Sequence, residues 1–338
     1  MATKDNAGYI FKKILNIKAY FTSLLLMSSV HANATDSFVS ATLDNDVFVG
    51  KDNGYTSGIY FSLYNVAGHL RPSLLVKPLI WSMPKWPVYY AINVHSIGQT
   101  LTTAEDITQE TPPSSSIPYS GLLKYTNAYI AVGLYYADWI STSIGMVGSE
   151  AKGEQTQNGI HRAIGVKKAQ GWGTQLKNEV VFNFSRGRSS RVFATGSDTL
   201  DLLVSGQISL GTITSGLNAS VILRVGQNLK HSFATMSLAS SRVSNPIAVN
   251  RSWFVYAGWS SNYVYSQIFT DGNTFRNSRS IDYGHSYNTF SAGVTYSVGE
   301  RGALTFAYNS SYAESDTEGS RPIETLNHYG TLTFAWQF

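Results

Sequence analysis

The 338-residue chain has no cysteine, few charged residues and no long hydrophobic run. The absence of cysteine excludes disulfides, cysteine-ligated zinc and thiol catalysis. Charged residues make up only 14% of the chain, and no apolar stretch approaches the roughly 18 residues that a membrane-spanning helix needs. A membrane protein with this sequence must therefore cross the bilayer as a closed barrel of strands, because a barrel satisfies every backbone polar group in lipid.

Two common hydrolase motifs are also missing. The sequence contains neither a G-x-S-x-G nucleophile elbow nor an H-E-x-x-H zinc helix. His285 and Ser286 are adjacent in an expected strand, so their side chains would point to opposite faces and make a poor Ser–His dyad. We interpret this pair as polar residues at the membrane interface.

The amino terminus has the features of an export signal. Lysines precede a short apolar run at 19–30, and a small-x-small cleavage signal follows at 32–34. We therefore expect residues 1–34 to be a secretory signal peptide and residues 35–338 to form one outer-membrane domain. The removed segment carries four lysines against one aspartate, net +3, so the formal charge of +4 falls to about +1. The basic balance of the chain is thus no argument for nucleic-acid binding.

The rest of the chain is dominated by alternation of apolar with small or polar residues. At the carboxyl end Leu332, Phe334, Trp336 and Phe338 share one face of a strand, with small and polar residues on the other. Such segments are typical of a barrel wall that separates lipid from a water-filled interior. The aromatic content of 13% suits the rings of aromatic residues that such barrels carry at both membrane interfaces. We expect an all-β fold, a transmembrane antiparallel β-barrel of twelve strands at 37–48, 55–66, 88–100, 121–136, 139–148, 174–193, 198–212, 214–226, 252–268, 284–298, 302–315 and 328–338.

An even number of strands places both termini on the periplasmic side, which fixes the side of every connection. Residues 101–120 and 149–173 then form extracellular loops, and Ala137-Asp138 forms a tight periplasmic link. Within strand 88–100, His95 is interpreted as a residue of the lumen. The stretch 151–168 lacks alternation and proline, which predicts a short helix in an extracellular loop.

Two groups of polar residues fall at the extracellular end. In the expected helix Gln157 and His161 stand four residues apart and share one face. Asp44-Asn45-Asp46 ends the first strand, and the stretch 51–58 leads into the second. The closely spaced oxygen side chains suit a hard cation such as calcium, and the Asn-Gly pair within the stretch equally suits a plain hairpin turn.

Five segments in this order resemble the outer-membrane lipid A 3'-O-deacylase family. The resemblance is good over residues 44–180, and beyond them it rests on strand pattern and length. The matching segments are Asp44-Asn45-Asp46-Val47-Phe48, Gly54-Tyr55-Thr56-Ser57-Gly58, Gly98-Gln99, Pro118-Tyr119-Ser120-Gly121, and Gly145-Met146-Val147-Gly148 running into Gln157-Asn158-Gly159-Ile160-His161.

The resemblance implies a calcium-dependent esterase that removes the 3'-linked acyl chain of lipid A at the outer leaflet. The family's active-site residues fall on Asn45, Asp46, Thr56, Gln157 and His161. His161 would activate water, with Gln157 orienting the imidazole or the water; Asp46 would hold Ca²⁺, and Asn45 and Thr56 would complete the donor set.

One element of the family pattern is absent. The family also uses a lysine in the second extracellular loop, whereas residues 101–123 contain none, and Lys124 is the nearest; Ile117 also stands where relatives carry arginine. These departures concern contacts to the substrate phosphates. We expect lipopolysaccharide of the outer leaflet as the partner and a monomer as the active form. The remaining alternatives are a pore, a structural barrel and an outer-membrane phospholipase.

Overall fold

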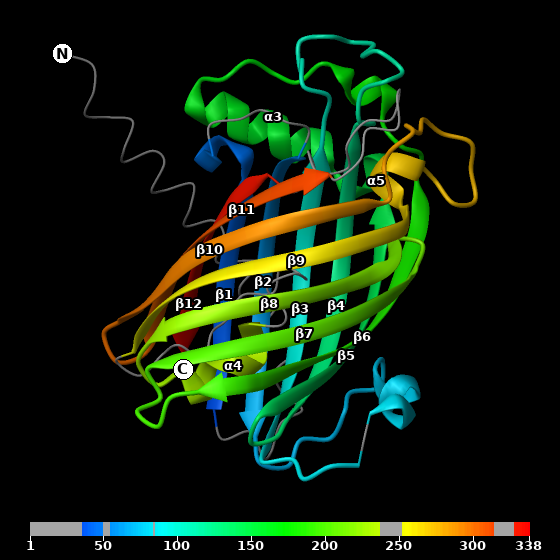
Figure 1. Ribbon diagram of the computed structural model, residues 1–338. Helices are drawn as coiled ribbons and strands as arrows, with labels where there is room; N and C mark the ends of the chain where they lie inside the picture. Colours follow the sequence, from blue (N-terminus) through cyan, green and yellow to red (C-terminus); the bar gives the residue numbers. More distant parts are fainter. Residues whose placement is uncertain (1–35, 50–54, 84, 237–251, 314–327) are drawn as a thin grey trace, which may run out of the picture.

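The protein forms a single closed β-barrel (Figure 1). The structure, a computed structural model, describes residues 36–49, 55–83, 85–236, 252–313 and 328–338. In these residues twelve antiparallel strands each pair with their neighbours in sequence, and the first pairs with the last. The strands are β1 (Asp36–Asn45), β2 (Tyr55–Ala67), β3 (Tyr90–Thr102), β4 (Ser120–Val132), β5 (Tyr136–Val147), β6 (Glu179–Ala194), β7 (Leu200–Gly211), β8 (Thr214–Gly226), β9 (Trp253–Gln267), β10 (Ser286–Val298), β11 (Gly302–Ala313) and β12 (Tyr329–Gln337).

The alternation seen in the sequence separates the two faces of the wall. In β12, Phe334 and Trp336 keep 44% and 42% of their surface exposed, whereas Thr333 and Ala335 between them keep 1% each. Thr333 bonds across the lumen face to Thr42 of β1 at 2.9 Å, which closes the barrel. The outward face is therefore apolar and the inward face small and polar, as a barrel in lipid requires.

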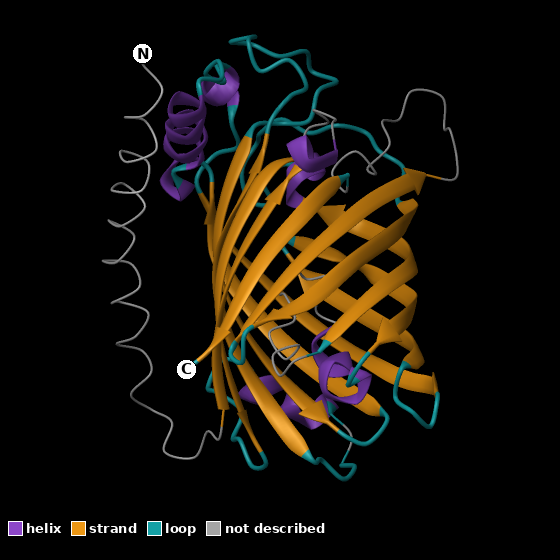
Figure 2. Cartoon of the chain, turned by 90° about the vertical axis from the view of Figure 1, so that its left-hand side faces the viewer, coloured by secondary structure: helices purple, strands orange, loops and turns teal. Residues whose placement is uncertain are grey.

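The end of the barrel at which the termini lie sets the orientation. Both described termini lie at the same end as the short turns at 133–135, 195–199 and 299–301, and the long connections 103–119 and 148–178 lie at the other (Figure 2). Bacterial barrels with an even number of strands keep both termini on the periplasmic side, so the connections 103–119 and 148–178 are extracellular. None of the helices in the described ranges is long and apolar enough to span a bilayer.

All twelve expected strands are confirmed, and two local predictions are wrong. The β4–β5 turn lies at 133–135 instead of Ala137-Asp138, because a Cβ on Gly133 would lie 2.2 Å from the Tyr136 ring, so the turn forms where a side chain is missing. His95 faces outward, since its neighbour Val94 packs in the lumen, and its Nδ1 lies 2.6 Å from the Tyr125 hydroxyl. The expected signal peptide falls outside the described residues.

Helix α4 (Leu229–Met236) fills the lumen at the periplasmic end. Phe233 and its buried neighbours pack there against the lumen faces of several strands, including Trp139 and Phe254. A charge cluster fixes the helix, because Arg224 donates to the Leu229 carbonyl at 2.7 Å while Asp201 accepts from Arg224 at 2.6 Å. The described part of the β8–β9 connection thus closes the lumen at this end.

Asp201→Asn should destabilise the barrel by about 3–5 kcal/mol, because Arg224 would remain buried without its counter-charge. Both side chains have no exposed surface, and Asp201 also accepts from Arg191 at 2.6 Å. Urea unfolding in detergent measures the change, and Asp106→Asn in an exposed loop is the control. Equal unfolding midpoints for the two variants would contradict this account of the cluster.

Candidate active site

The first group of expected site residues lies where β1 ends. Asn45 is the last residue of β1 and stands opposite Ser57 of β2. Asp46 begins the short helix η3 (Asp46–Val49), and its side chain is only 3% exposed. The β2–β3 register shifts between Tyr55 and Ser57, so Thr56 occupies a β-bulge, a feature that is common beside active sites because it re-aims the chain.

The second group lies on the predicted loop helix. The helix α3 (Gly153–Ile164) follows the 3-10 helix η5 (Ser149–Ala151) and carries both Gln157 and His161, so this prediction is confirmed. It lies at the extracellular end of the barrel (Figure 2). The loop is tied to the wall through the Gln99 amide of β3, which donates to the Ala151 carbonyl at 2.5 Å.

Two glycines let α3 rest directly on the barrel. A Cβ on Gly121 of β4 would come within 3.1 Å of the Gly153 backbone, and a Cβ on Gly153 would lie 2.7 Å from the Trp172 ring and 3.0 Å from Leu101. Leu123, on the same face of β4 as Gly121, is one of the exposed apolar residues of the lipid-facing wall. The first turn of α3 therefore lies against the outer surface of the wall.

Gln157 points into a small core beneath the helix. Trp172, in the 3-10 helix η6 (Gly171–Thr174), donates its indole N–H to Gln157 Oε1 at 2.8 Å, and its ring meets Tyr119 edge-on at 5.3 Å. Gln157 is 2% exposed, and its Nε2 has no hydrogen-bond partner in the described part of the chain. A buried amide N–H without a partner costs about 1–3 kcal/mol, so this donor is suited to a substrate oxygen or a water.

His161 is held by the chain that follows the helix. Its Nδ1 lies 2.6 Å from the Lys167 carbonyl oxygen, which can only accept, so in the neutral imidazole Nδ1 carries the proton and Nε2 the lone pair. The same return segment is fixed by Asn158, whose Oδ1 accepts from the Ala169 N–H at 2.9 Å. The imidazole is thus set in the tautomer that a general base needs.

Cross-strand register places the two groups on one surface. Asn45 stands opposite Ser57, and Ser57 stands opposite Leu101, whose side chain borders Gly153 of the helix. Neighbouring strands are about 4.8 Å apart, so Asn45 lies roughly 10 Å from the strand beneath α3. Asn45 has the parity of Leu43, which is exposed on the lipid-facing surface. The candidate site therefore opens outward, between the barrel wall and the outer leaflet.

The second extracellular loop lacks the lysine of the family pattern, and it carries the exposed acidic residue Asp106. The pKa of Asp106 is held below its usual range chiefly by hydrogen bonds from the Thr108 hydroxyl and N–H, with smaller contributions from Gln109 and from the charge of Lys167. Lys124 lies elsewhere, since it lines a lumen cavity of about 240 Å³ together with Thr126. Lys124 thus does not replace the missing lysine on the outer face, whereas Lys167, whose charge acts on Asp106, is a described lysine beside this loop.

The donors near Asp46 fit a hard cation. Carboxylate and amide oxygens such as those of Asp46 and Asn45 are ligands that calcium prefers. The described residues contain no cluster of three or more His, Cys, Asp or Glu side chains, and stretch 50–54 lies outside them. Among the described residues, therefore, no three such side chains come together at Asp46.

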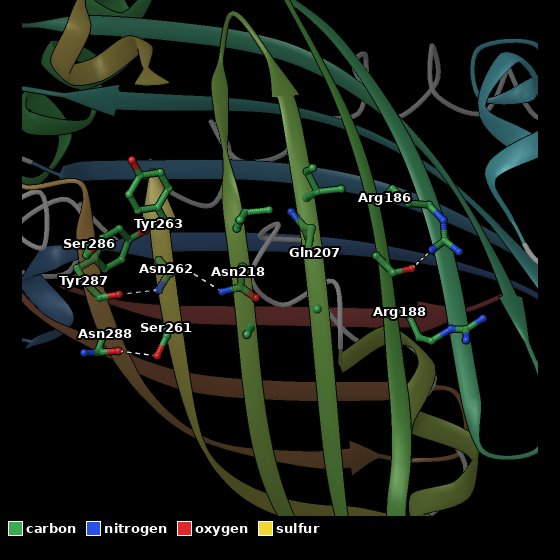
Figure 3. Close-up of a pocket in the computed structure, with 15 residues that line it drawn as sticks. Arg186, Arg188, Gln207, Asn218, Ser261, Asn262, Tyr263, Ser286, Tyr287 and Asn288 are labelled. Atoms are coloured by element: carbon green, nitrogen blue, oxygen red, sulfur yellow. Dashed lines mark hydrogen bonds between the residues drawn. The ribbon is translucent and has the colours of Figure 1, made fainter. Parts of the chain in front are cut away.

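A separate groove crosses the outer face of β6 to β10 (Figure 3). Small residues such as Gly206 and Ala219 line it, and Arg186 and Arg188 point from its edge toward β5. Ser286 also lines it, while the preceding His285 places Nδ1 2.7 Å from the Val264 carbonyl. No hydrogen bond joins these two described side chains, which agrees with the interpretation that they form no catalytic dyad.

Taken with its closed twelve-strand fold, a site on the outer wall defines an outer-membrane barrel protein. The model of the family described as outer membrane protein LpxR matches residues 20–338. The chain therefore belongs to this family, which confirms the lipid A 3'-O-deacylase family that the motifs indicate.

Two solved structures are similar to this chain, and the first of them agrees with its fold. LpxR from Salmonella typhimurium is 16% identical, with 88% of this chain and 99% of that chain covered and a TM-score of 0.69. The translocator domain of the autotransporter NalP from Neisseria meningitidis is 9% identical, with 98% and 97% covered and a TM-score of 0.40. No curated protein matches the chain.

Proposed function

We propose that the chain is an outer-membrane esterase that removes the 3'-linked acyl chain of lipid A. The observation that carries the proposal is the His161 contact to the Lys167 carbonyl, which leaves Nε2 available as a base on a helix seated against the outer wall. Family membership supports the substrate class. The outward position of the site supports it too, because lipid A lies in the leaflet beside that wall.

In the proposed reaction His161 Nε2 takes a proton from water, and the hydroxide adds to the ester carbonyl carbon. The oxyanion then collapses, the bond to the sugar oxygen breaks, and the imidazolium returns its proton to that oxygen, so that water and ester give a fatty acid and an alcohol. Since Trp172 occupies Gln157 Oε1, we assign Gln157 a donor role through Nε2 toward the oxyanion or the attacking water.

Asn45 and Thr56 complete the proposed donor set at the end of β1 and at the bulge of β2. A Ca²⁺ ion bound by Asp46 would act as a Lewis acid on the ester carbonyl. The remaining alternatives lack comparable support. A pore is disfavoured because α4 fills the lumen. A phospholipase with a Ser–His dyad is disfavoured because His285 places Nδ1 against the Val264 carbonyl and not against Ser286. We expect the barrel to act as a monomer.

Lipid A from cells that express the chain should lose the mass of its 3'-linked acyl group, because the site faces the leaflet that contains this ester. Mass spectrometry of extracted lipid A measures the loss, with His161→Ala expression as the matched control. Unchanged lipid A beside a folded, surface-exposed barrel would reject the proposed reaction.

Calcium should be required, with half-maximal rate at about 10⁻⁴–10⁻³ M, because a site with few carboxylate ligands binds calcium weakly. Ester hydrolysis in detergent micelles, titrated with Ca²⁺ after chelation, measures this requirement. Asp46→Asn should shift the titration to higher concentration, whereas Asp106→Asn should leave it unchanged. Full turnover in excess chelator would remove the metal from the reaction.

A further inference from the structure

The connection between β2 and β3 does not simply cross the periplasmic end. Residues 68–89, here called the collar, include the 3-10 helix η4 (Lys77–Ser82), and the described residues 68–83 and 85–89 run along the outside of β3, β4 and β5. In Figure 1 the collar is the cyan segment at the lower edge of the barrel. It therefore lies where the wall would otherwise meet lipid.

The first half of the collar satisfies polar groups on the outer wall. Asn93 donates to the Arg71 carbonyl at 3.0 Å, and Thr142 donates to the Leu75 carbonyl at 3.0 Å. Asn127, with no exposed surface, accepts from the Ser73 hydroxyl. These outward-facing polar side chains would be costly in hydrocarbon without partners, so the collar is a fixed part of the wall.

The second half is fastened by a cation and two rings. The Arg188 guanidinium lies 4.0 Å from the centre of a Trp86 ring, and that tryptophan meets Tyr136 edge-on at 5.0 Å. The Tyr136 hydroxyl donates to the Pro87 carbonyl at 2.7 Å, and Asp138 pairs with Arg188 at 2.5 Å. Both halves of the collar are thus held to the outer wall of β3–β6.

The free face of the collar is apolar and cationic. Leu74 and Trp81 each keep 81% of their surface exposed. So much exposed apolar surface is unfavourable in water. Arg71, Lys77 and Lys85 are exposed beside them, and residues 68–89 contain no aspartate or glutamate. Tryptophan together with basic residues and without acidic ones is typical of a segment that lies in a membrane interface and attracts anionic lipid.

The height of the collar fits that environment. It covers the wall up to Thr142, and the next outward residue of β5 is Ile144, which is 45% exposed. Thr142 stands opposite Phe184 of β6, another exposed apolar residue, whereas Arg186 and Arg188 follow below it. The collar therefore begins at the lower edge of the apolar belt, on the periplasmic side.

We propose that the collar is a binding surface for the phospholipids of the periplasmic leaflet, with Leu74 and Trp81 inserted among the acyl chains and Arg71, Lys77 and Lys85 at the phosphates. Charge complementarity and continuity with the apolar belt select a lipid surface over a protein partner. This inference does not depend on the proposed esterase activity.

The absence of cysteine makes the test direct, because Leu74→Cys and Trp81→Cys each introduce a single thiol. Each is labelled with an environment-sensitive fluorophore, and the full barrel is placed in vesicles of phosphatidylethanolamine and phosphatidylglycerol with brominated acyl chains. Leu217→Cys on the apolar wall and Thr111→Cys in an extracellular loop are the two controls.

Quenching at positions 74 and 81 should come within about twofold of the Leu217 probe and exceed the Thr111 probe several-fold. The double variant Lys77→Glu, Lys85→Glu in the Leu74→Cys background should lose the increase in quenching that a higher phosphatidylglycerol fraction gives. Quenching no greater than at Thr111 would overturn the proposal, as would protection of the probe by periplasmic protein without any effect of lipid. Quenching that never depends on phosphatidylglycerol would overturn the role of the basic residues.

Discussion

His161→Ala should lower the rate of ester hydrolysis by about 10²–10⁴-fold, the usual cost of losing a general base. The loss should appear in kcat, because the imidazole acts on water and not on the bound acyl chain. Release of fatty acid from purified lipid A in micelles measures it. The barrel should stay folded, since α3 contributes nothing to the strand ladder.

The matched control for this variant is His285→Ala. Both histidines lie at the extracellular end and place Nδ1 against a backbone carbonyl, at 2.6 Å and 2.7 Å, but only His161 lies on α3. His285→Ala should keep most of the activity. Loss of turnover in His285→Ala with retention in His161→Ala would move the reaction to the start of β10.

Gly153→Ala should reduce turnover by about 10²-fold, because its methyl group would lie 2.7 Å from the buried Trp172 ring and lift α3 from the wall. A displacement of about 1 Å at a catalytic group is enough for a loss of this size. Gly159→Ala on the same helix meets nothing within 4 Å. That control should keep full activity and gain up to about 1 kcal/mol of helix stability.

The same hydrolysis assay compares the two glycine variants, and resistance of the folded barrel to denaturation by dodecyl sulfate shows that both are assembled. Equal activity in the two variants would mean that the seat of α3 on Gly121 and Gly153 has no catalytic role. It would leave the assignment of His161 untouched, because that assignment is tested separately.

The barrel could be predicted from the sequence because period-two alternation is a local property of each strand. The alternation within residues 332–338 predicts by itself which side of the strand faces lipid. The parity of His95 could not be read in this way, since polar residues such as Asn93 and Asn127 occupy the outer wall of β3 and β4. Their partners come from the collar, a contact between segments that alternation does not encode.

The sequence predicts which residues form the candidate site, but it does not predict what surrounds them. Motif order selects Gln157 and His161, and the missing alternation predicts that a short helix carries them. The partner of Gln157 is Trp172, fifteen residues away across a loop, and the partner of His161 is a backbone carbonyl. Sequence patterns carry no signal for a carbonyl contact, so the tautomer of His161 emerges only from the fold.

The outward opening of the site changes what substrate concentration means for this protein. A lipid would reach Asn45 and α3 by lateral diffusion in the leaflet, so the rate would depend on its mole fraction among neighbouring lipids and not on its amount per volume of solution. Dilution of the leaflet with an inert lipid would slow turnover at constant total substrate. The encounter of lipid and protein would thus be a two-dimensional search, and its rate would depend on membrane fluidity and crowding.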